Sequence, residues 1–183
     1  MTTIEAPQAI ETRAYGYRFR SRLEARWATF FTELDLDFQY EPQGFELPGV
    51  GPYLPDFFVA DWNAWVEIKP KTPTMDELLL CASLAGETRQ RVLLFAGECY
   101  AAKHAIYQFH DGKGGMFNLL AECPKCRCVS ALLAMDERDS ILSKLGQCSC
   151  SETPLLSERG SRLLDAYTAA RSARFEHGEA RDV

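Results

Sequence analysis

Two carboxylates and a lysine, Asp56, Glu67 and Lys69, stand where a single β-hairpin would bring them together. Apolar runs lie on either side of the segment 60–63, which carries the Asp and Asn residues that turns favour. If the hairpin is symmetric about the 61/62 bond, Asp56 lies directly opposite Glu67, with Cβ atoms about 4.5–5.5 Å apart. Like charges at that separation repel unless a cation lies between them, so the spacing predicts a metal site.

The alternation of side chains along the second strand defines the rest of this group. Lys69 falls on the same face as Glu67, whereas Val66 and Ile68 point to the other face and into a core. Pro70 ends the strand, because proline cannot donate to a ladder. The acidic pair and the lysine are therefore expected on a rigid element.

Pro55-Asp56, ten residues, and then Glu67-Ile68-Lys69 resembles the signature of the PD-(D/E)xK nuclease superfamily, metal-dependent phosphodiesterases with the restriction-endonuclease-like fold. The resemblance covers roughly residues 17–96 and rests on the motif and the order of elements. It implies that Asp56 and Glu67 bind Mg²⁺, or Mn²⁺ in its place, and that the carbonyl of Ile68 adds an oxygen ligand. Lys69 would orient the attacking water and offset charge on the pentavalent transition state.

A helix over residues 18–34 is predicted upstream, with Ser21 as its cap. Its buried face is marked by Leu23, Trp27, Phe30 and Leu34. Glu24 borders that face, and in many members of the superfamily an acidic residue on the first helix joins the metal cluster, so Glu24 is the matching position. The alternative is that Glu24 pairs with Arg20 or a neighbouring arginine on the helix surface.

The order of elements also fits the core of that fold. The helix is followed by strand candidates at 38–47, 53–59 and 64–69, a helix near 75–86 and a strand at 92–95. We therefore expect an α/β fold, a restriction-endonuclease-like core with a mixed sheet flanked by helices. The expected domains are a nuclease-like core with a basic lead-in (1–100), a β-hairpin with a zinc-ribbon-like insertion (101–153), and a C-terminal helix and tail (154–183).

A cysteine cluster predicts a second, structural metal site. Cys123 and Cys126 form a CxxC at the end of an apolar strand candidate, and Cys148-Ser-Cys150 follows after 21 residues. The preferred ligands of a zinc ribbon are Cys123, Cys126, Cys148 and Cys150, with Cys128 as a rival. A redox CxxC is the competing interpretation, but that motif normally opens a helix, and residues 129–135 read as a strand. Such clustering among seven cysteines favours a reducing compartment.

The charge distribution indicates a local rather than a general affinity for nucleic acid. The net charge is −6, yet the first 30 residues hold five arginines against three glutamates. A basic strip beside an acidic metal site would grip flanking phosphates of DNA, although a solvated helix face explains such strips equally well. The expected phosphate contacts are Arg18, Arg20, Arg22, Arg26 and Lys71. Tyr15, Tyr17 and Phe19 could stack on bases or form an edge strand.

The spacing of apolar residues in the C-terminal tail predicts a helix within 157–174, with one apolar side formed by Leu163, Leu164, Tyr167 and Ala170. It could pack on the core, contact DNA or mediate self-association. At 183 residues and 46% hydrophobic content, the chain is long enough for one good core. No apolar run reaches the roughly 18–20 residues of a membrane span, and the N-terminus lacks a signal pattern, so the cytoplasm is the expected compartment.

The function expected from these features is Mg²⁺-dependent hydrolysis of DNA phosphodiester bonds. The alternative is a nuclease-like module that is inactive, or that acts only with a partner in a larger nucleoprotein assembly. The short tract from Glu67 to Pro70 resembles that of transposon-end-cutting enzymes, and a phage or mobile-element context fits the size. Double-strand cutting usually needs two active sites, so a homodimer is a reasonable expectation.

Overall fold

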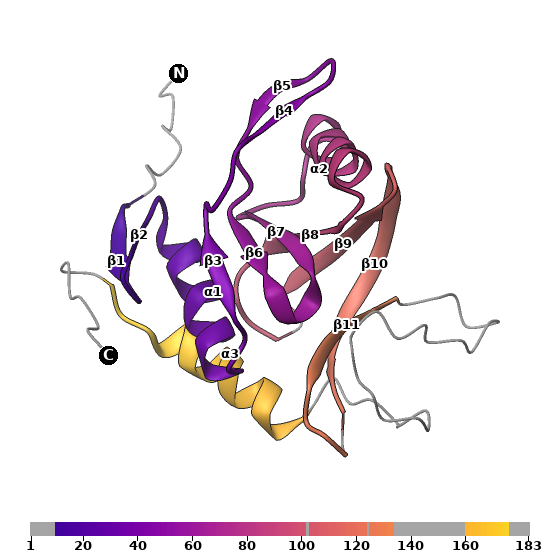
Figure 1. Cartoon of the computed structure of the whole chain (residues 1–183). Helices are drawn as coiled ribbons and strands as arrows, with labels where there is room; N and C mark the ends of the chain where they lie inside the picture. Colours follow the sequence, from indigo (N-terminus) through magenta and orange to yellow (C-terminus); the bar gives the residue numbers. More distant parts are fainter. Residues whose placement is uncertain (1–9, 102, 124, 134–159, 176–183) are drawn as a thin grey trace, which may run out of the picture.

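A seven-stranded sheet with helices on both faces forms the centre of the computed structural model, which describes residues 10–101, 103–123, 125–133 and 160–175 (Figure 1). The expected mixed α/β fold is confirmed. In spatial order the strands are β11 (Val129–Leu133), β10 (Lys113–Glu122), β9 (His104–His110), β8 (Arg91–Gly97), β7 (Ala64–Lys69), β6 (Phe57–Val59) and β3 (Phe38–Tyr40). Two smaller sheets pair β1 (Thr12–Ala14) with β2 (Tyr17–Phe19), and β4 (Phe45–Leu47) with β5 (Gly51–Tyr53).

The β6/β7 hairpin has the predicted register. The 3₁₀ turn η1 (Ala60–Trp62) joins the strands, and the last bridged pair is Phe57 with Val66. Continued by one residue, this register sets Asp56 opposite Glu67. The alternation of side chains is therefore confirmed as the feature that brings the two carboxylates together.

β7 and β8 run parallel and are connected by α2 (Met75–Thr88). Pro70 directly follows β7, and Thr74 caps α2 in a capping box with Glu77. Because parallel strands end at the same edge of a sheet, the residues that follow Lys69 and Gly97 share one edge. Open α/β sheets bind their ligands at this carboxyl edge.

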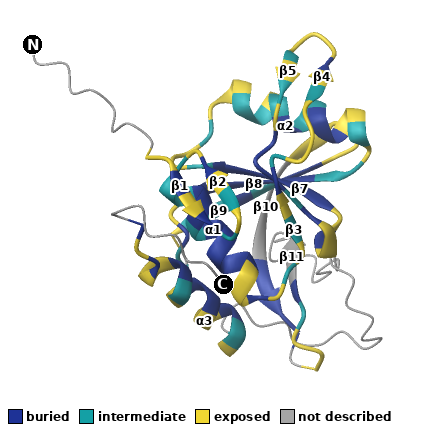
Figure 2. Ribbon diagram, turned by 60° about the vertical axis from the view of Figure 1, so that its left-hand side comes forward, coloured by how far each residue is buried: buried dark blue, intermediate teal, exposed yellow. Residues whose placement is uncertain are grey.

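α1 (Arg22–Glu33) covers one face of the sheet. Ser21 caps it as predicted, since its Oγ accepts the Glu24 N–H at 3.2 Å. The helix starts later than expected because residues 17–19 form β2, so the edge-strand interpretation of this aromatic tract is the one that the structure shows. Its buried residues include Trp27, Ala28, Phe30 and Phe31, which are fully buried. Figure 2 colours each residue by how far it is buried.

α3 (Ser161–Ser172) packs beside α1 on the same face (Figures 1 and 2). Its buried side is formed by Leu163, Ala166, Tyr167 and Ala170. Leu164, which was expected on this side, is 38% exposed, because the contact with α1 is centred one residue away. Of the three roles considered for the tail, the structure shows packing on the core.

The opposite face is covered by α2 and by the β4/β5 hairpin (Figure 1). Leu47 of β4 packs there with Leu84 of α2 and Trp65 of β7. The single strand expected over 38–47 is wrong: the chain breaks at Glu41, which has a left-handed φ of 46°, and at Pro42. The break lets β4 leave the main sheet.

The strands after residue 100 extend the same sheet. β9 pairs with β8, β10 with β9 and β11 with β10, all antiparallel. Within the described residues, these strands therefore continue the main sheet, and residues 134–153 of the expected zinc-ribbon-like insertion lie outside the described residues. Cys148 and Cys150 lie outside the described residues. None of the helices described has the length and apolar character of a bilayer-spanning segment.

His104, on β9, should make the fold less stable in weak acid. Its Nδ1 donates to the Tyr100 carbonyl at 2.9 Å, so its Nε2 accepts from the Tyr167 hydroxyl at 3.1 Å. Burial lowers the pKa of His104 from its ordinary value, so the unfolded chain takes up a proton that the folded chain does not. We expect its contribution to be intact above about pH 6.5 and to fall below it by up to about 1.4 kcal/mol per pH unit.

Denaturant unfolding of the wild type and of His104→Gln from about pH 5 to about pH 8 measures this contribution. The wild type should lose stability faster than the variant as the pH falls. Equal slopes for the two proteins would contradict the assignment.

Candidate functional site

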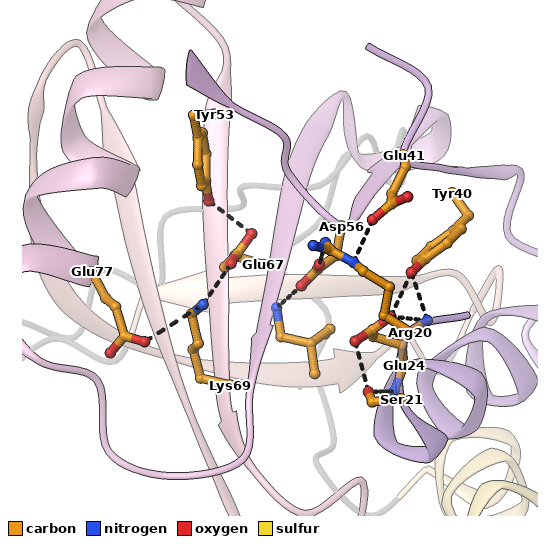
Figure 3. A network of polar contacts seen from close by, with 11 residues as sticks. Arg20, Ser21, Glu24, Tyr40, Glu41, Tyr53, Asp56, Glu67, Lys69 and Glu77 are labelled. Carbon is orange, nitrogen blue, oxygen red and sulfur yellow. Dashed lines mark hydrogen bonds and ion pairs between the residues drawn. The ribbon is translucent and has the colours of Figure 1, made fainter. Parts of the chain in front are cut away.

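The residues predicted to bind metal lie at the carboxyl edge of the sheet, where β6 begins and β7 ends (Figure 3). Asp56 and Glu67 are 4% and 5% exposed. Buried carboxylates cost free energy unless they are paired and hydrogen-bonded. Their partners therefore define what the site can do.

Asp56 is held by one backbone group and one cation. Its Oδ2 accepts the Ile68 N–H at 2.7 Å, and its Oδ1 pairs with Arg20 at 2.9 Å. Arg20 also contacts Glu41 at 2.6 Å. The side chain of Asp56 is thus oriented by β7 itself, while Arg20 supplies a positive charge from the segment that leads into α1.

Glu67 has a matching arrangement on the other side. Its Oε2 accepts the Tyr53 hydroxyl at 2.7 Å, and its Oε1 pairs with Lys69 at 2.9 Å. Lys69 lies 3.5 Å from Glu77 in the first turn of α2. Burial alone would lower the pKa of Lys69, but the charge and hydrogen bond of Glu67 outweigh it and raise that pKa, so the ammonium is positively charged.

These contacts form two triads, each with a cation between two carboxylates. Glu77, Lys69 and Glu67 form one, and Asp56, Arg20 and Glu41 form the other (Figure 3). The triads meet through Glu67 and Asp56, two like charges. Burial and the charge of Glu67 raise the pKa of Asp56 well above its ordinary value, although the Ile68 N–H and Arg20 act in the opposite direction.

The repulsion between Asp56 and Glu67 is large compared with the stabilising free energy of an ion pair at the protein surface. Two unit charges about 5 Å apart repel by about 3 kcal/mol at an effective dielectric constant of about 20. An exposed ion pair contributes about 0–1 kcal/mol. Buried carboxylates with a perturbed pKa, such as Asp56, cluster at functional sites.

Glu24 lies beside this junction but faces a different set of donors. Its Oε2 accepts the Tyr40 hydroxyl at 2.6 Å and the Arg20 backbone N–H at 3.0 Å, and its Oε1 accepts the Ser21 hydroxyl at 2.6 Å. Its charge still raises the pKa of Asp56. The alternative of a surface pair with the Arg20 side chain does not describe it, because Glu24 is buried and bonds the backbone of Arg20.

The carboxylates of Asp56 and Glu67 are donors of the kind that hard divalent cations prefer, and a Mg²⁺ or Mn²⁺ site here stays a prediction. Carboxylate oxygens are the ligands of Mg²⁺ and Mn²⁺, and an ion between Asp56 and Glu67 would remove the repulsion that raises the pKa of Asp56. Ile68 contributes its N–H to Asp56, which orients that carboxylate. The carbonyl of Ile68 and the carboxylate of Glu24 stay predicted ligands.

The basic residues expected to contact phosphates are in varied surroundings. Arg20 is engaged by Asp56 and Glu41, and Arg18 by Glu11. Lys71 is exposed in the bend after β7. Arg22 and Arg26 each bury an Nε without a hydrogen-bond partner in the structure.

Arg26 belongs to a basic pocket that the sequence did not reveal. A cavity of about 200 Å³ is lined by Arg26, Lys103, Arg171, Tyr100, Cys99 and Glu98. The Arg171 guanidinium lies 4.8 Å from the centre of the Tyr100 ring. The segment 98–103 follows β8, so this pocket is on the carboxyl edge, like Lys69.

Four partners of the acidic residues were missed by sequence reasoning. Glu77 could have been found, since Thr74-x-x-Glu77 before an apolar run is a capping box and Pro70 ends β7 just ahead of it. The remaining three are Tyr40, Glu41 and Tyr53. Their roles depend on how β3 and β5 approach the hairpin, which is not local information.

The cysteines form a second cluster, at the junction of β10 and β11. The sulfurs of Cys123, Cys126 and Cys128 lie within 4.8 Å of one another. The other two predicted ligands, Cys148 and Cys150, are outside the described residues. The structure thus brings the predicted rival, Cys128, next to the first half of the predicted set.

No protein-family model matches the chain, and no curated protein or solved structure matches it either. The function is therefore inferred from the geometry of the site.

Binding of a hard divalent cation should stabilise the fold through Asp56 and Glu67. Mg²⁺ or Mn²⁺ should raise the Tm of the wild type, with about 2.7 kcal/mol gained at a cation concentration of about 100 times Kd. Asp56→Ala and Glu67→Ala should each abolish the rise. Thermal unfolding followed by far-UV circular dichroism, with EDTA to reverse the effect, measures it.

Asp61→Ala is the matched control. Asp61 lies on the same hairpin but is exposed and accepts the Asp37 N–H at 2.7 Å, as expected of a turn residue. This variant should keep the full metal-induced shift. A shift that survives in Asp56→Ala would show that the ion binds elsewhere.

Proposed function

We propose that the protein is a metal-dependent endonuclease of the PD-(D/E)xK type that hydrolyses phosphodiester bonds in DNA. The observation that carries this proposal is the buried pair Asp56 and Glu67, held face to face across a hairpin with Lys69 beside it. A divalent cation between the two carboxylates would make that pairing favourable. The proposal includes a restriction-endonuclease-like core.

The order of elements supports that core. α1 precedes the β6/β7 hairpin, and α2 then crosses to β8, which is parallel to β7. An acidic residue on the first helix, Glu24, lies next to Asp56 in this arrangement. The elements and the signature residues thus agree with each other.

Each residue of the site has a separate task in this mechanism. Asp56 and Glu67 would hold the ion, with Glu24 completing or extending the ligand shell. The bound metal would polarise the phosphate and lower the pKa of a water molecule. Lys69, positively charged beside Glu67, would orient the attacking water and offset the charge that builds up on the phosphate oxygens.

Neighbouring groups orient and neutralise the two carboxylates that would bind the metal. The Tyr53 hydroxyl fixes one oxygen of Glu67, and the Ile68 N–H fixes one oxygen of Asp56, so both carboxylates are oriented before any substrate arrives. Arg20 neutralises Asp56, and its side chain is 56% exposed. It can therefore turn toward solvent and a phosphate once Asp56 has another cation.

The second candidate is a nuclease that acts only with a partner, and the ion pairs within the site favour it. Arg20 and Lys69 are the cations that the described site provides for its own carboxylates. A nucleoprotein partner that draws Arg20 away from Asp56 would then be needed for activity. If the protein binds DNA but cleaves it with none of the metals tested, that result would support this alternative.

Asp56→Ala and Lys69→Ala should abolish DNA cleavage for different reasons. The first removes a metal ligand, and the second removes the charge that stabilises the transition state, which typically costs a factor of about 10²–10³ or more. The assay is cleavage of supercoiled plasmid and of labelled single-stranded DNA with Mg²⁺, with Mn²⁺ and with EDTA. Asp61→Ala should cut like the wild type.

The pattern of losses separates the outcomes. Cleavage that needs metal and is absent from both variants supports the proposal. Cleavage that persists in Asp56→Ala at the wild-type rate would indicate a contaminating nuclease and refute the assignment of this site.

The basic pocket at the carboxyl edge should bind DNA phosphates without taking part in the chemistry. Lys103→Ala should weaken DNA binding for all sequences and reduce the slope of log K against log salt by about 1. Lys113→Ala is the control, because Lys113 is exposed at the opposite edge, after the β9–β10 turn. Fluorescence anisotropy over a range of salt concentrations measures both slopes, and equal slopes for the two variants would exclude the pocket as a phosphate contact.

A further inference from the structure

Three thiols lie on the short loop that joins β10 to β11. Cys123, Cys126 and Cys128 have sulfur atoms that all lie within 4.8 Å of one another. In a tetrahedral zinc site with Zn–S bonds of about 2.3 Å, the sulfurs are about 3.8 Å apart. One ion can therefore contact all three without a change in the fold of the loop.

The backbone of the loop holds the thiols in this arrangement. The Cys123 N–H donates to the Cys128 carbonyl at 2.9 Å, and the Arg127 N–H donates to the Cys123 carbonyl at 2.8 Å. Arg127, between two of the cysteines, has a left-handed φ of 61°. A residue other than glycine adopts this conformation at a cost of about 1–2 kcal/mol, which a bound ion would offset.

Disulfide chemistry fits the same atoms less well. The sulfurs of Cys126 and Cys128 are 3.2 Å apart, whereas a disulfide bond is about 2.05 Å long. Redox CxxC motifs open a helix, but Cys126 is followed within three residues by the strand β11. Soft thiolates in a tight cluster favour Zn²⁺ over the hard cations expected at Asp56.

The loop is also fastened to the start of α3. Glu122, just before Cys123, accepts the Leu163 N–H at 3.2 Å and pairs with the Arg127 Nε at 2.9 Å. Arg127 donates to the Ser161 hydroxyl at 2.9 Å. A Cβ at Gly160 would lie 2.1 Å from Glu122, so only glycine permits this approach.

A second contact runs from α3 to the end of α1. Arg162 donates to the Arg127 carbonyl at 3.3 Å and to the Leu34 carbonyl at 2.6 Å. Leu34 is the C-cap residue that directly follows α1. The thiol loop, α3 and α1 are thus connected by direct hydrogen bonds.

We propose that Cys123, Cys126 and Cys128 are three of the four ligands of one structural Zn²⁺, with Cys128 a ligand in its own right, and that this ion fastens α3 onto α1. Cys126 is exposed and, like Cys128, lines a cavity of about 340 Å³. A chelator can therefore reach the ion in the folded protein. The site does not depend on the proposed nuclease activity.

The first experiment counts zinc and identifies its ligands. The purified protein should contain about one zinc per chain by mass spectrometry of the metal, and Co²⁺ in its place should give thiolate charge-transfer bands. Cys128→Ser should lose the metal as fully as Cys123→Ser and Cys126→Ser. Cys99→Ser, a substitution of a buried cysteine outside the cluster, should keep it.

The same set of variants includes Cys148→Ser and Cys150→Ser, which test the ribbon set predicted from the sequence. Full zinc content and an unchanged Co²⁺ spectrum in Cys128→Ser, together with loss of metal in both of these variants, would overturn the proposal. Loss of metal in Cys128→Ser supports it, whatever the other two variants do.

Alkylation of the wild type avoids the risk that a variant does not fold. With zinc bound, iodoacetamide should label Cys126 and Cys128 far more slowly than after treatment with a chelator, as read by peptide mass spectrometry. Hydrogen exchange in α3 should accelerate when the ion is removed, while exchange in α2 should not change. Equal labelling of Cys128 in the two states, or equal exchange of α3, would contradict the corresponding part of the proposal.

Discussion

The repulsion between two buried carboxylates is the constraint on which the candidate site depends. Asp56 and Glu67 face each other because the register of β6 and β7 leaves them no other position. Three neighbours act against that repulsion, Arg20 and Lys69 through charge and Tyr53 through a hydrogen bond, whereas the charge of Glu24 adds to it. An apolar pair at these positions would cost the fold less. The arrangement is understandable when a cation is part of the working protein.

The hairpin keeps its register despite the repulsion between Asp56 and Glu67, because each of its two faces packs in a separate apolar core. Val66 and Ile68 pack toward α1, and Trp65 packs toward α2. A slip of one residue would exchange the faces and place the charge of Glu67 in the core beneath α1. The register is thus determined by apolar packing away from the site, and the carboxylates follow.

What could be predicted from the sequence was local. The Asp56–Glu67 register, the cap at Ser21 and the end of β7 at Pro70 depend on alternation, a hydroxyl and a proline, which can be read within a few residues. The departure of β4 from the main sheet could not be read in this way, because it depends on a left-handed Glu41 and on packing against α2.

The same limit explains the errors around the C-terminal half. An apolar strand such as β9 pairs with whichever edge is open, and the sequence does not show that β8 offers one. The helical spacing of α3 predicts correctly that Leu163 and Tyr167 are buried. It does not show which element α3 packs against, so the prediction for Leu164 is wrong. The ion pairs of Arg20 with Asp56 and Glu41 could not be predicted either, because both carboxylates are distant from it in the chain.

The two proposed metal sites would have different roles because their donors differ. Oxygen ligands at Asp56 and Glu67 suit a hard ion that keeps water and exchanges readily, whereas thiolates at Cys123, Cys126 and Cys128 suit an ion that is held for structure. With these donors, the proposed Mg²⁺ or Mn²⁺ site at one end of α1 and the proposed Zn²⁺ site near the other would each favour its own ion. Glu24 stands in the first turn of α1, and Leu34, which Arg162 contacts, is the C-cap residue that directly follows that helix. A zinc ion that fixes α3 against α1 therefore also restrains the helix that positions Glu24 beside Asp56.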